Sequence, residues 1–440
     1  NGVAEYVRAL INSLEQLHIR NGSLLGPDEI PQENSGQIEL SLAIHPDDRA
    51  KLASAIEMLS EGGYRLVHEL NSGARVSTLT FAWFENLALK TARVDLVFEA
   101  PKSRIKVRNS WIADSEAAFT CILLKCVAKQ SLGPQDERRA RVLAERLGRT
   151  RAEGIASELF GTRAAERVAA ACRAGGLQKL LEQLQRSFVR NRWQHNPGAA
   201  LSSCWSNARL RFRRWSRPDG LALVLLGPDG VGKSTLVNGM MSSLGPIFKG
   251  VNVSHWRPGV VVPIRDGDKS AENPHDDPPR SAFVSTLYLL GFCLDFWVGH
   301  AVRIRPQLTR SEFVIFDRYY YDLLVDQVRY RYSGSKGLLR FLLRFIPKRD
   351  QVILILDAPE NVILSRKRQL TLAELQRQRV AYRGLTTTLS NAHIIETQHG
   401  IEPALSAACR VATEYMSQRL ESRRAKPALH HTLQIQEGSL

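Results

Sequence analysis

The stretch that decides the fold reads Leu221-Ala-Leu-Val-Leu-Leu226, followed directly by Gly227-Pro-Asp-Gly-Val-Gly-Lys-Ser-Thr235. Its first six residues are all apolar, which predicts a parallel strand buried on both faces. The next nine match the phosphate-binding pattern G-x-x-x-x-G-K-[ST]. The apolar positions that follow, Leu236, Val237 and Met240, predict a helix that begins at about Lys233. A strand, a glycine-rich loop and a helix in this order predict a nucleotide-binding P-loop.

The chemistry of this loop follows from its residue types. Glycines allow a tight loop whose backbone N–H groups converge on an anion, and the helix N-terminus adds the positive end of its dipole. We expect Lys233 to neutralise the β- and γ-phosphates of ATP and the Ser234 hydroxyl to bind Mg²⁺. The predicted cofactor-binding residues are Gly227, Pro228, Asp229, Gly230, Val231, Gly232, Lys233, Ser234 and Thr235.

Length and composition limit the number of domains, the class of ligand and the cellular compartment that fit this protein. The 440 residues suggest two or three domains. The net charge of +16 suits nucleic acid, an anionic membrane surface or a protein that handles polyphosphates. No DNA- or RNA-binding motif accompanies the charge, so we do not expect nucleic acid. The six cysteines include no C-x-x-C pair, which argues against structural zinc and favours a reducing cytoplasm. The sequence begins at Asn1, so a preceding targeting peptide stays open.

Changes in composition predict the domain boundaries. We expect an α+β domain over residues 1–112, a helical domain over 113–200, a basic linker over 201–218, the P-loop domain over 219–421 and a disordered tail over 422–440. The linker carries Trp205, Phe212 and Trp215 among several arginines, and is interpreted as a solvated or interface-packed segment. Contact with an anionic lipid surface or a nucleic acid is the alternative.

The P-loop domain is predicted to be α/β with a parallel sheet, because strands alternate with helices. The further strands are expected at 251–256, 312–317, 351–357 and 393–396. The polar stretch 266–279 is predicted to be a substrate loop or lid. Residues 282–304 approach the length of a membrane span, but Asp295 within them favours a helix that covers the sheet.

Charged residues at predicted strand ends supply the remaining candidates. Asp317 ends one strand and is our first choice for holding Mg²⁺, with Asp357 as the competing choice. Arg318 can grip an acceptor phosphate in a bidentate manner, unless it makes a structural salt bridge instead. Arg366 and Lys367 lead the later basic segment that should meet transition-state charge, with Arg377 and Arg379 behind them.

Taken together, these motifs resemble those of a known protein family. With the P-loop, Asp317-Arg318-Tyr319 and the basic segment after Asp357-Ala-Pro-Glu360, residues 219–421 resemble the thymidylate kinase family. The resemblance is closest to thymidylate kinase-like proteins whose kinase domain follows a nucleotidyltransferase-like region. It implies a three-layer P-loop kinase fold and transfer of the γ-phosphate of ATP, with Mg²⁺, to a nucleoside monophosphate, dTMP first. A homodimer stays open.

The resemblance also implies residue roles. Asp229 is expected to approach the acceptor sugar, and Lys233, Asp317, Arg318, Arg366 and Lys367 complete the catalytic set. The substrate-binding set implied is Arg257, Arg318, Tyr319 and Tyr320. For Arg257, a role at the acceptor and a role elsewhere are equally open, and for the tyrosines core packing is the alternative.

The sequence leaves three classes of function open. The first is a kinase for dTMP or a related nucleotide. The second is a P-loop kinase for another small molecule, such as a sugar or sugar phosphate. The third is a nucleotide-gated binding module with little turnover.

The N-terminal region loosely resembles the nucleotidyltransferase superfamily. There a Gly-Ser turn, here Gly22-Ser23, precedes a strand with two carboxylates two residues apart, which hold metal ions. The matching positions are Glu39 and Ser41, and Asp95 fits the third carboxylate. A serine brings no charge to a divalent ion, so we expect an inert or merely binding domain, with residual transferase activity as the alternative.

Overall fold

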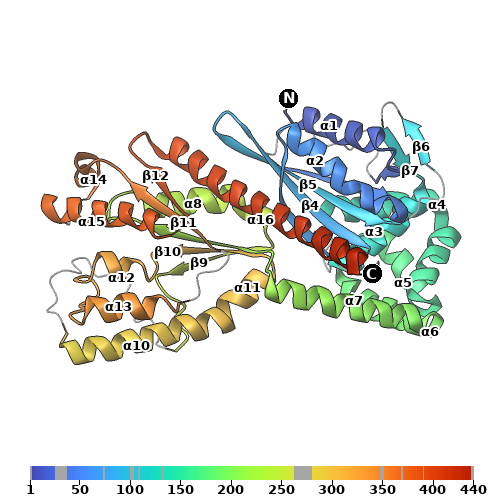
Figure 1. Ribbon diagram of the computed structural model, residues 1–440. Helices are drawn as coiled ribbons and strands as arrows, with labels where there is room; N and C mark the ends of the chain where they lie inside the picture. Colours follow the sequence, from blue (N-terminus) through green and yellow to red (C-terminus); the bar gives the residue numbers. More distant parts are fainter. Residues whose placement is uncertain are drawn as a thin grey trace. The chain divides into compact units, whose positions relative to one another are not determined.

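The computed structural model describes residues 2–24, 37–72, 75–99, 104–107, 110–129, 133–261, 280–346, 351–367, 370–389 and 391–437. The expected polar loop 266–279 lies outside these residues. The chain divides into two compact units: residues 1–85 and 90–212 form unit 1, and residues 86–89 and 213–440 form unit 2. Figure 1 labels the elements.

Unit 1 contains a seven-stranded sheet of order β3-β4-β5-β2-β1-β7-β6. Its strands are β1 (Asn21–Ser23), β2 (Gln37–Ile44), β3 (Arg65–Asn71), β4 (Val76–Glu85), β5 (Ala88–Phe98), β6 (Arg104–Val107) and β7 (Ser110–Ala113). Its helices are α1 (Gly2–Gln16), η1 (Pro46–Lys51), α2 (Leu52–Glu61), α3 (Ser115–Lys129), α4 (Pro134–Phe160), α5 (Thr162–Ala174), η2 (Leu177–Leu180), α6 (Leu181–His195) and α7 (Pro197–Ser216), which continues into unit 2.

Sheet and helices of unit 1 share one hydrophobic core. Strand residues Ala43 and Val97 belong to the same buried cluster as Phe119 of α3 and Phe160 of α4. The boundary expected at residue 112 therefore does not separate two domains, because α3 to α6 bury their apolar faces with the sheet. The stretch 201–218, expected to be a basic linker, is mostly the helix α7, and the boundary between the two units at residues 212 and 213 falls within it.

Unit 2 contains a five-stranded, all-parallel sheet of order β12-β11-β8-β10-β9. Its strands are β8 (Leu221–Leu226), β9 (Gly250–His255), β10 (Glu312–Asp317), β11 (Gln351–Asp357) and β12 (Ala392–Glu396). All five expected strands are present. Every residue of β8 is buried, because strands flank it on both sides and helices cover both faces.

Helices cover both faces of this sheet, α8 and α16 on one and α10 and α13 on the other (Figure 1). The helices are α8 (Lys233–Leu244), η3 (Gly245–Ile247), α10 (Ala282–Gly299), a π-helical turn η4 (His300–Ile304), α11 (Arg305–Thr309), α12 (Asp322–Val325), α13 (Lys336–Leu343), α14 (Glu360–Arg366), α15 (Leu372–Gly384), η5 (Leu385–Thr387) and α16 (Ile401–Glu437). The disordered tail expected from residue 422 is corrected over 422–437: α16 continues through this stretch, which is rich in helix-forming Ala, Leu, Arg and Gln.

The apolar helix expected over 282–304 is α10 with η4. Its inner residues Leu289, Phe292 and Phe296 join the core cluster of the sheet, so it packs on the sheet as predicted. Its outer face is apolar as well, with Phe283 80% and Leu287 62% exposed. Within the described residues, Ala282–Thr309 is the one segment that could cross a membrane by length and composition, and 33% of its most apolar window is buried.

Candidate functional site

The P-loop joins β8 to α8 and depends on glycine at two close approaches. Gly227 has φ 142°, and a Cβ there would lie 2.6 Å from the Leu356 carbonyl oxygen. Gly230 has φ 88°, and a Cβ there would lie 2.9 Å from the Lys367 Cβ. Both positions exclude a side chain by backbone conformation and by space. The loop pattern in the sequence is therefore required by the tertiary packing around it.

Lys233 is buried at the start of α8, with 8% of its surface exposed. Its ammonium donates to the carbonyl oxygens of Gly227, at 2.7 Å, and Pro228, at 2.8 Å. Burial and, after it, the Arg318 cation lower the pKa of Lys233 to about 8, although the nearby carboxylates oppose the shift. Ser234 and Thr235 follow on the first turn of α8 and are exposed. The ammonium thus lies inside the loop, and the Ser234 hydroxyl is accessible.

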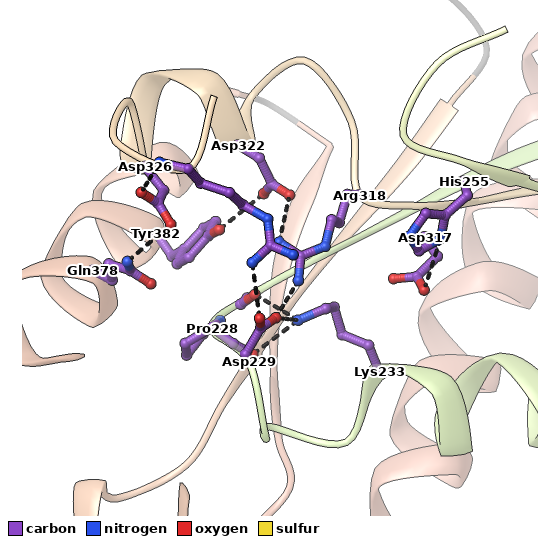
Figure 2. A network of polar contacts seen from close by, with 12 residues as sticks. Pro228, Asp229, Lys233, His255, Asp317, Arg318, Asp322, Asp326, Gln378 and Tyr382 are labelled. Atoms are coloured by element: carbon purple, nitrogen blue, oxygen red, sulfur yellow. Dashed lines mark hydrogen bonds and ion pairs between the residues drawn. The ribbon is translucent and has the colours of Figure 1, made fainter. Parts of the chain in front are cut away.

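Asp229 lies at the centre of the network of polar contacts in the site (Figure 2). Its carboxylate accepts hydrogen bonds from Arg318 and from Arg329, the latter at 2.8 Å, and it lies 3.6 Å from the Lys233 ammonium. Burial raises the pKa of Asp229, but these three cations outweigh burial and hold the pKa well below its ordinary value. Sequence reasoning named Asp229, Lys233 and Arg318 but missed Arg329, which no motif marks.

Arg318 follows β10 directly and adopts a left-handed φ of 76°. That conformation costs a non-glycine residue about 1–2 kcal/mol, and it is held partly by a hydrogen bond from the Arg318 N–H to the Leu225 carbonyl, at 3.0 Å. Backbone strain of this kind gathers at functional sites. The conformation directs the guanidinium toward the P-loop, where it meets Asp229 (Figure 2).

A buried carboxylate supports Arg318 from the other side. Asp322 has no exposed surface, lies 3.7 Å from Arg318 and accepts a hydrogen bond from the Tyr382 hydroxyl at 2.9 Å. Burial raises the pKa of Asp322 to about 6, although the neighbouring cations oppose the shift. Arg318 is therefore held between two carboxylates, Asp229 in the P-loop and Asp322 at the start of α12.

Asp317 ends β10 opposite Leu225 of the P-loop strand. One carboxylate oxygen lies 3.3 Å from His255 Nδ1, at the end of β9, while the other is buried and has no hydrogen-bond partner. Burial raises the pKa of Asp317, but the His255 hydrogen bond and the Lys233 charge lower it overall. His255 was not identified from the sequence. A buried carboxylate oxygen with spare acceptor capacity fits an oxygen-ligated cation such as Mg²⁺.

Asp357, the competing metal candidate, is already neutralised by arginines. Its side chain is 3% exposed and accepts hydrogen bonds from Arg379 Nε and Arg383 Nε, both at 2.7 Å. Arg379 also pairs with Glu360. These contacts occupy both Asp357 and Arg379 and favour Asp317 for the metal. Arg377 likewise pairs with Glu374 and donates to the Val325 carbonyl.

Arg366 and Lys367, which lead the basic segment identified in the sequence, lie next to the P-loop. Arg366 donates to the Thr397 carbonyl at 3.1 Å and to the Val231 carbonyl at 3.5 Å. The Lys367 Cβ is the atom that a side chain at Gly230 would meet. The Arg366 guanidinium thus lies at the phosphate-binding loop, and the chain at Lys367, directly after α14, passes close to Gly230.

Arg257, Tyr319 and Tyr320, for which the sequence left two roles open, are all buried. Arg257 is 2% exposed and lies 3.5 Å from buried Asp295 of α10, because the chain turns inward after Trp256, where φ is 67°. Tyr319 and Tyr320 are core residues that pack edge-to-face on Phe296. Tyr320 also lines a cavity of about 870 Å³ within unit 2, beside α13 and α15.

In unit 1, lysines surround Asp95, the residue that matches the third metal-binding carboxylate of the nucleotidyltransferase pattern. Ser41 and Asp95 are opposite each other on β2 and β5. The Lys125 ammonium lies 2.9 Å from the Ser41 hydroxyl, 2.8 Å from Asp95 and 2.7 Å from Asp136. Lys129 also contacts Asp95, at 2.5 Å. Burial raises the pKa of Asp95, but the two ammoniums hold it at about 2.

Glu39, which matches the first carboxylate of that pattern, is exposed and pairs with Arg93 at 3.0 Å. Within the described ranges, no group of three or more His, Cys, Asp or Glu side chains could hold a metal ion.

Comparison with solved structures finds thymidylate kinases. The chain is 15% identical to thymidylate kinase from Ehrlichia chaffeensis, with 43% of this chain and 96% of that chain covered and a TM-score of 0.33. It is 16% identical to thymidylate kinase from Candida albicans, with 45% and 93% covered and a TM-score of 0.34. No protein-family model and no curated protein matches the sequence.

Proposed function

We propose that unit 2 is an ATP- and Mg²⁺-dependent phosphotransferase whose acceptor already carries a phosphate, with a nucleoside monophosphate, dTMP first, as the acceptor. The observation that carries the proposal is the pairing of Arg318 with Asp229 beside the P-loop lysine. A guanidinium held at the carboxyl edge of a parallel sheet, next to a phosphate-binding loop, suits a second phosphate group. Against a neutral hydroxyl it would serve little purpose.

Each residue has a role in this proposal. Lys233, Arg366 and Lys367 stabilise the negative charge of the transferring phosphoryl group. Arg318 and the neighbouring Arg329 bind the acceptor phosphate, and Asp229 positions the acceptor sugar. Ser234 and Asp317 would hold Mg²⁺, which supplies charge neutralisation at the phosphates. Arg257 is left out of the acceptor site, because it is buried against Asp295.

The decisive experiment measures ADP release from ATP and Mg²⁺ with a panel of acceptors. The panel holds dTMP, dUMP, other nucleoside monophosphates, sugar phosphates and neutral nucleosides. We expect release with a monophosphate and little with neutral nucleosides. Release with neutral acceptors alone would replace this proposal with a kinase for hydroxylated small molecules, and no release with any acceptor would favour a nucleotide-gated binding module.

Two variants assign the reaction to this site. Lys233→Ala should weaken ATP binding and abolish transfer while the fold is kept. Arg318→Ala should raise the KM for the acceptor much more than the KM for ATP. Unchanged turnover in Lys233→Ala would refute the assignment of the site. Arg340→Ala, on the exposed surface of α13, is the matched control and should leave both constants unchanged.

For unit 1 we propose no metal-dependent nucleotidyl transfer, because ammonium groups already neutralise Asp95. Nucleotidyl transfer by the Lys233→Ala chain that disappears on adding Glu39→Ala would overturn this.

A further inference from the structure

Unit 1 contains a second cavity that the P-loop chemistry does not use. Its volume is about 1040 Å³. Its wall is made by the end of α4, the first turn of α5, the second half of α6 and Arg75 before β4. These segments are far apart in the sequence and meet only in the folded unit.

Positive charge gathers around this cavity. Its lining includes five arginines and one carboxylate: Arg75, Arg163, Arg167, Arg190, Arg192 and Glu158. Arg75 pairs with Glu99 at 3.0 Å. For the other four arginines, the described part of the chain offers no ion pair. Burial and the nearby Arg75 cation lower the pKa of Arg192, so like charges face each other here. Such an arrangement is relieved by an anion.

The backbone of the wall suits the same ligand class. Helix α5 runs for 13 residues, and its first turn lines the cavity after Gly161, whose φ is 81°. No side chain caps this helix start, so its N-terminal dipole adds to the positive potential. Asn191 of α6 is buried and donates to the Glu158 carbonyl at 2.9 Å, which fixes α6 against the end of α4. The wall is therefore held in place by internal contacts.

We propose that this cavity binds a small molecule that carries an oligophosphate group, at a site separate from the P-loop. The volume is near the upper end of small-molecule sites, about 300–1,000 Å³, which suits a nucleotide-sized ligand. A single-stranded nucleic acid would need exposed aromatic side chains along a groove. The aromatic lining residues are Phe160, which is buried, and Phe188, which packs against the core. The compact anion is therefore the favoured occupant.

The test uses the full chain with Lys233→Ala as the parent, to weaken the P-loop site, and inorganic tripolyphosphate as the probe in titration calorimetry. Adding Arg163→Gln and Arg167→Gln should weaken tripolyphosphate binding about tenfold or more, because charge-assisted hydrogen bonds are lost. Arg192→Gln should act in the same direction. Arg186→Gln is the matched control on α6: its side chain is 84% exposed and it does not line the cavity.

The proposal is independent of the proposed kinase reaction. If no acceptor in the panel supports ADP release, the proposal about the cavity is unaffected. If tripolyphosphate does not bind, the proposed kinase reaction is unaffected. It is overturned if the parent does not bind tripolyphosphate, if the double variant binds it as tightly as the parent, or if Arg186→Gln weakens binding equally. Displacement of tripolyphosphate by a single-stranded oligonucleotide, with an affinity that rises with oligonucleotide length, would overturn it in favour of nucleic acid. Unchanged thermal unfolding of each variant confirms that binding, not folding, is measured.

Discussion

Replacing Lys125 by methionine tests whether ammonium groups stabilise the buried carboxylate of unit 1. The Lys125 side chain is 6% exposed, and its ammonium contacts Asp95, Asp136 and Ser41 within 2.9 Å. Removing one partner of a buried ion pair costs about 3–5 kcal/mol. Lys129 continues to contact Asp95, so we expect the lower end, about 3 kcal/mol. For a unit of this size that corresponds to a fall in Tm of about 6–12 °C.

The pH dependence of this effect follows from the pKa of Asp95. The ammoniums hold that pKa at about 2, below the ordinary 3.8. Asp95 therefore contributes about 2 kcal/mol of stability that is present above pH 4 and is lost as pH falls toward 2. In Lys125→Met one of the two ammoniums that oppose the effect of burial is lost, so the pKa of Asp95 rises and acidification removes less stability. The difference between the native chain and the variant should shrink between pH 7 and pH 3.

The measurement is urea unfolding at both pH values, with hydrogen–deuterium exchange to assign the transition to unit 1. Adding both Asp95→Asn and Lys129→Met to Lys125→Met should recover part of the loss, because the buried carboxylate and both of its ammonium partners are then removed together. Lys51→Met is the control, since that lysine is 46% exposed and lies 3.1 Å from Asp48. A loss below about 0.5 kcal/mol in Lys125→Met, within the range of ordinary surface substitutions, would refute the reasoning. A triple variant that is no more stable than Lys125→Met alone would refute it as well.

Three further predictions concern unit 2. Gly230→Ala should weaken ATP binding, measured by calorimetry, about tenfold or more, because the added methyl group displaces Lys367. The control is Gly400→Ala, which also has a positive φ but has no atom within 4 Å of the added Cβ, and it should bind ATP normally. Asp317→Asn should raise the Mg²⁺ concentration needed for half-maximal ADP release, and an unchanged Mg²⁺ dependence would return the metal role to Asp357. Arg257→Met should lower the free energy of unfolding by about 3 kcal/mol with unchanged acceptor KM; lost acceptor use at full stability would restore Arg257 to the substrate site.

The P-loop and the strands around it could be predicted because their signals are local. An unbroken apolar run such as Leu221–Leu226 suits only a strand covered on both faces, and the glycine spacing after it specifies a loop that closes on an anion. The position of Asp317 followed from the same logic, because parallel strands end at one edge of a sheet. Where side-chain spacing carries the chemistry, the sequence was sufficient.

The partners of charged residues could not be predicted, because they depend on contacts between distant segments. Arg329 reaches Asp229 across 100 residues, and Lys125 reaches Ser41 across 84. The basic cavity could not be predicted for the same reason. Its arginines lie just before β4 and on the helices α5 and α6, and they share no sequence motif. The role of Arg257 also depends on tertiary packing, because its counter-charge, the buried Asp295, comes close to it only in the folded unit. A charged residue is recognised from the sequence, but its role is decided by the burial and counter-charge that only folding supplies.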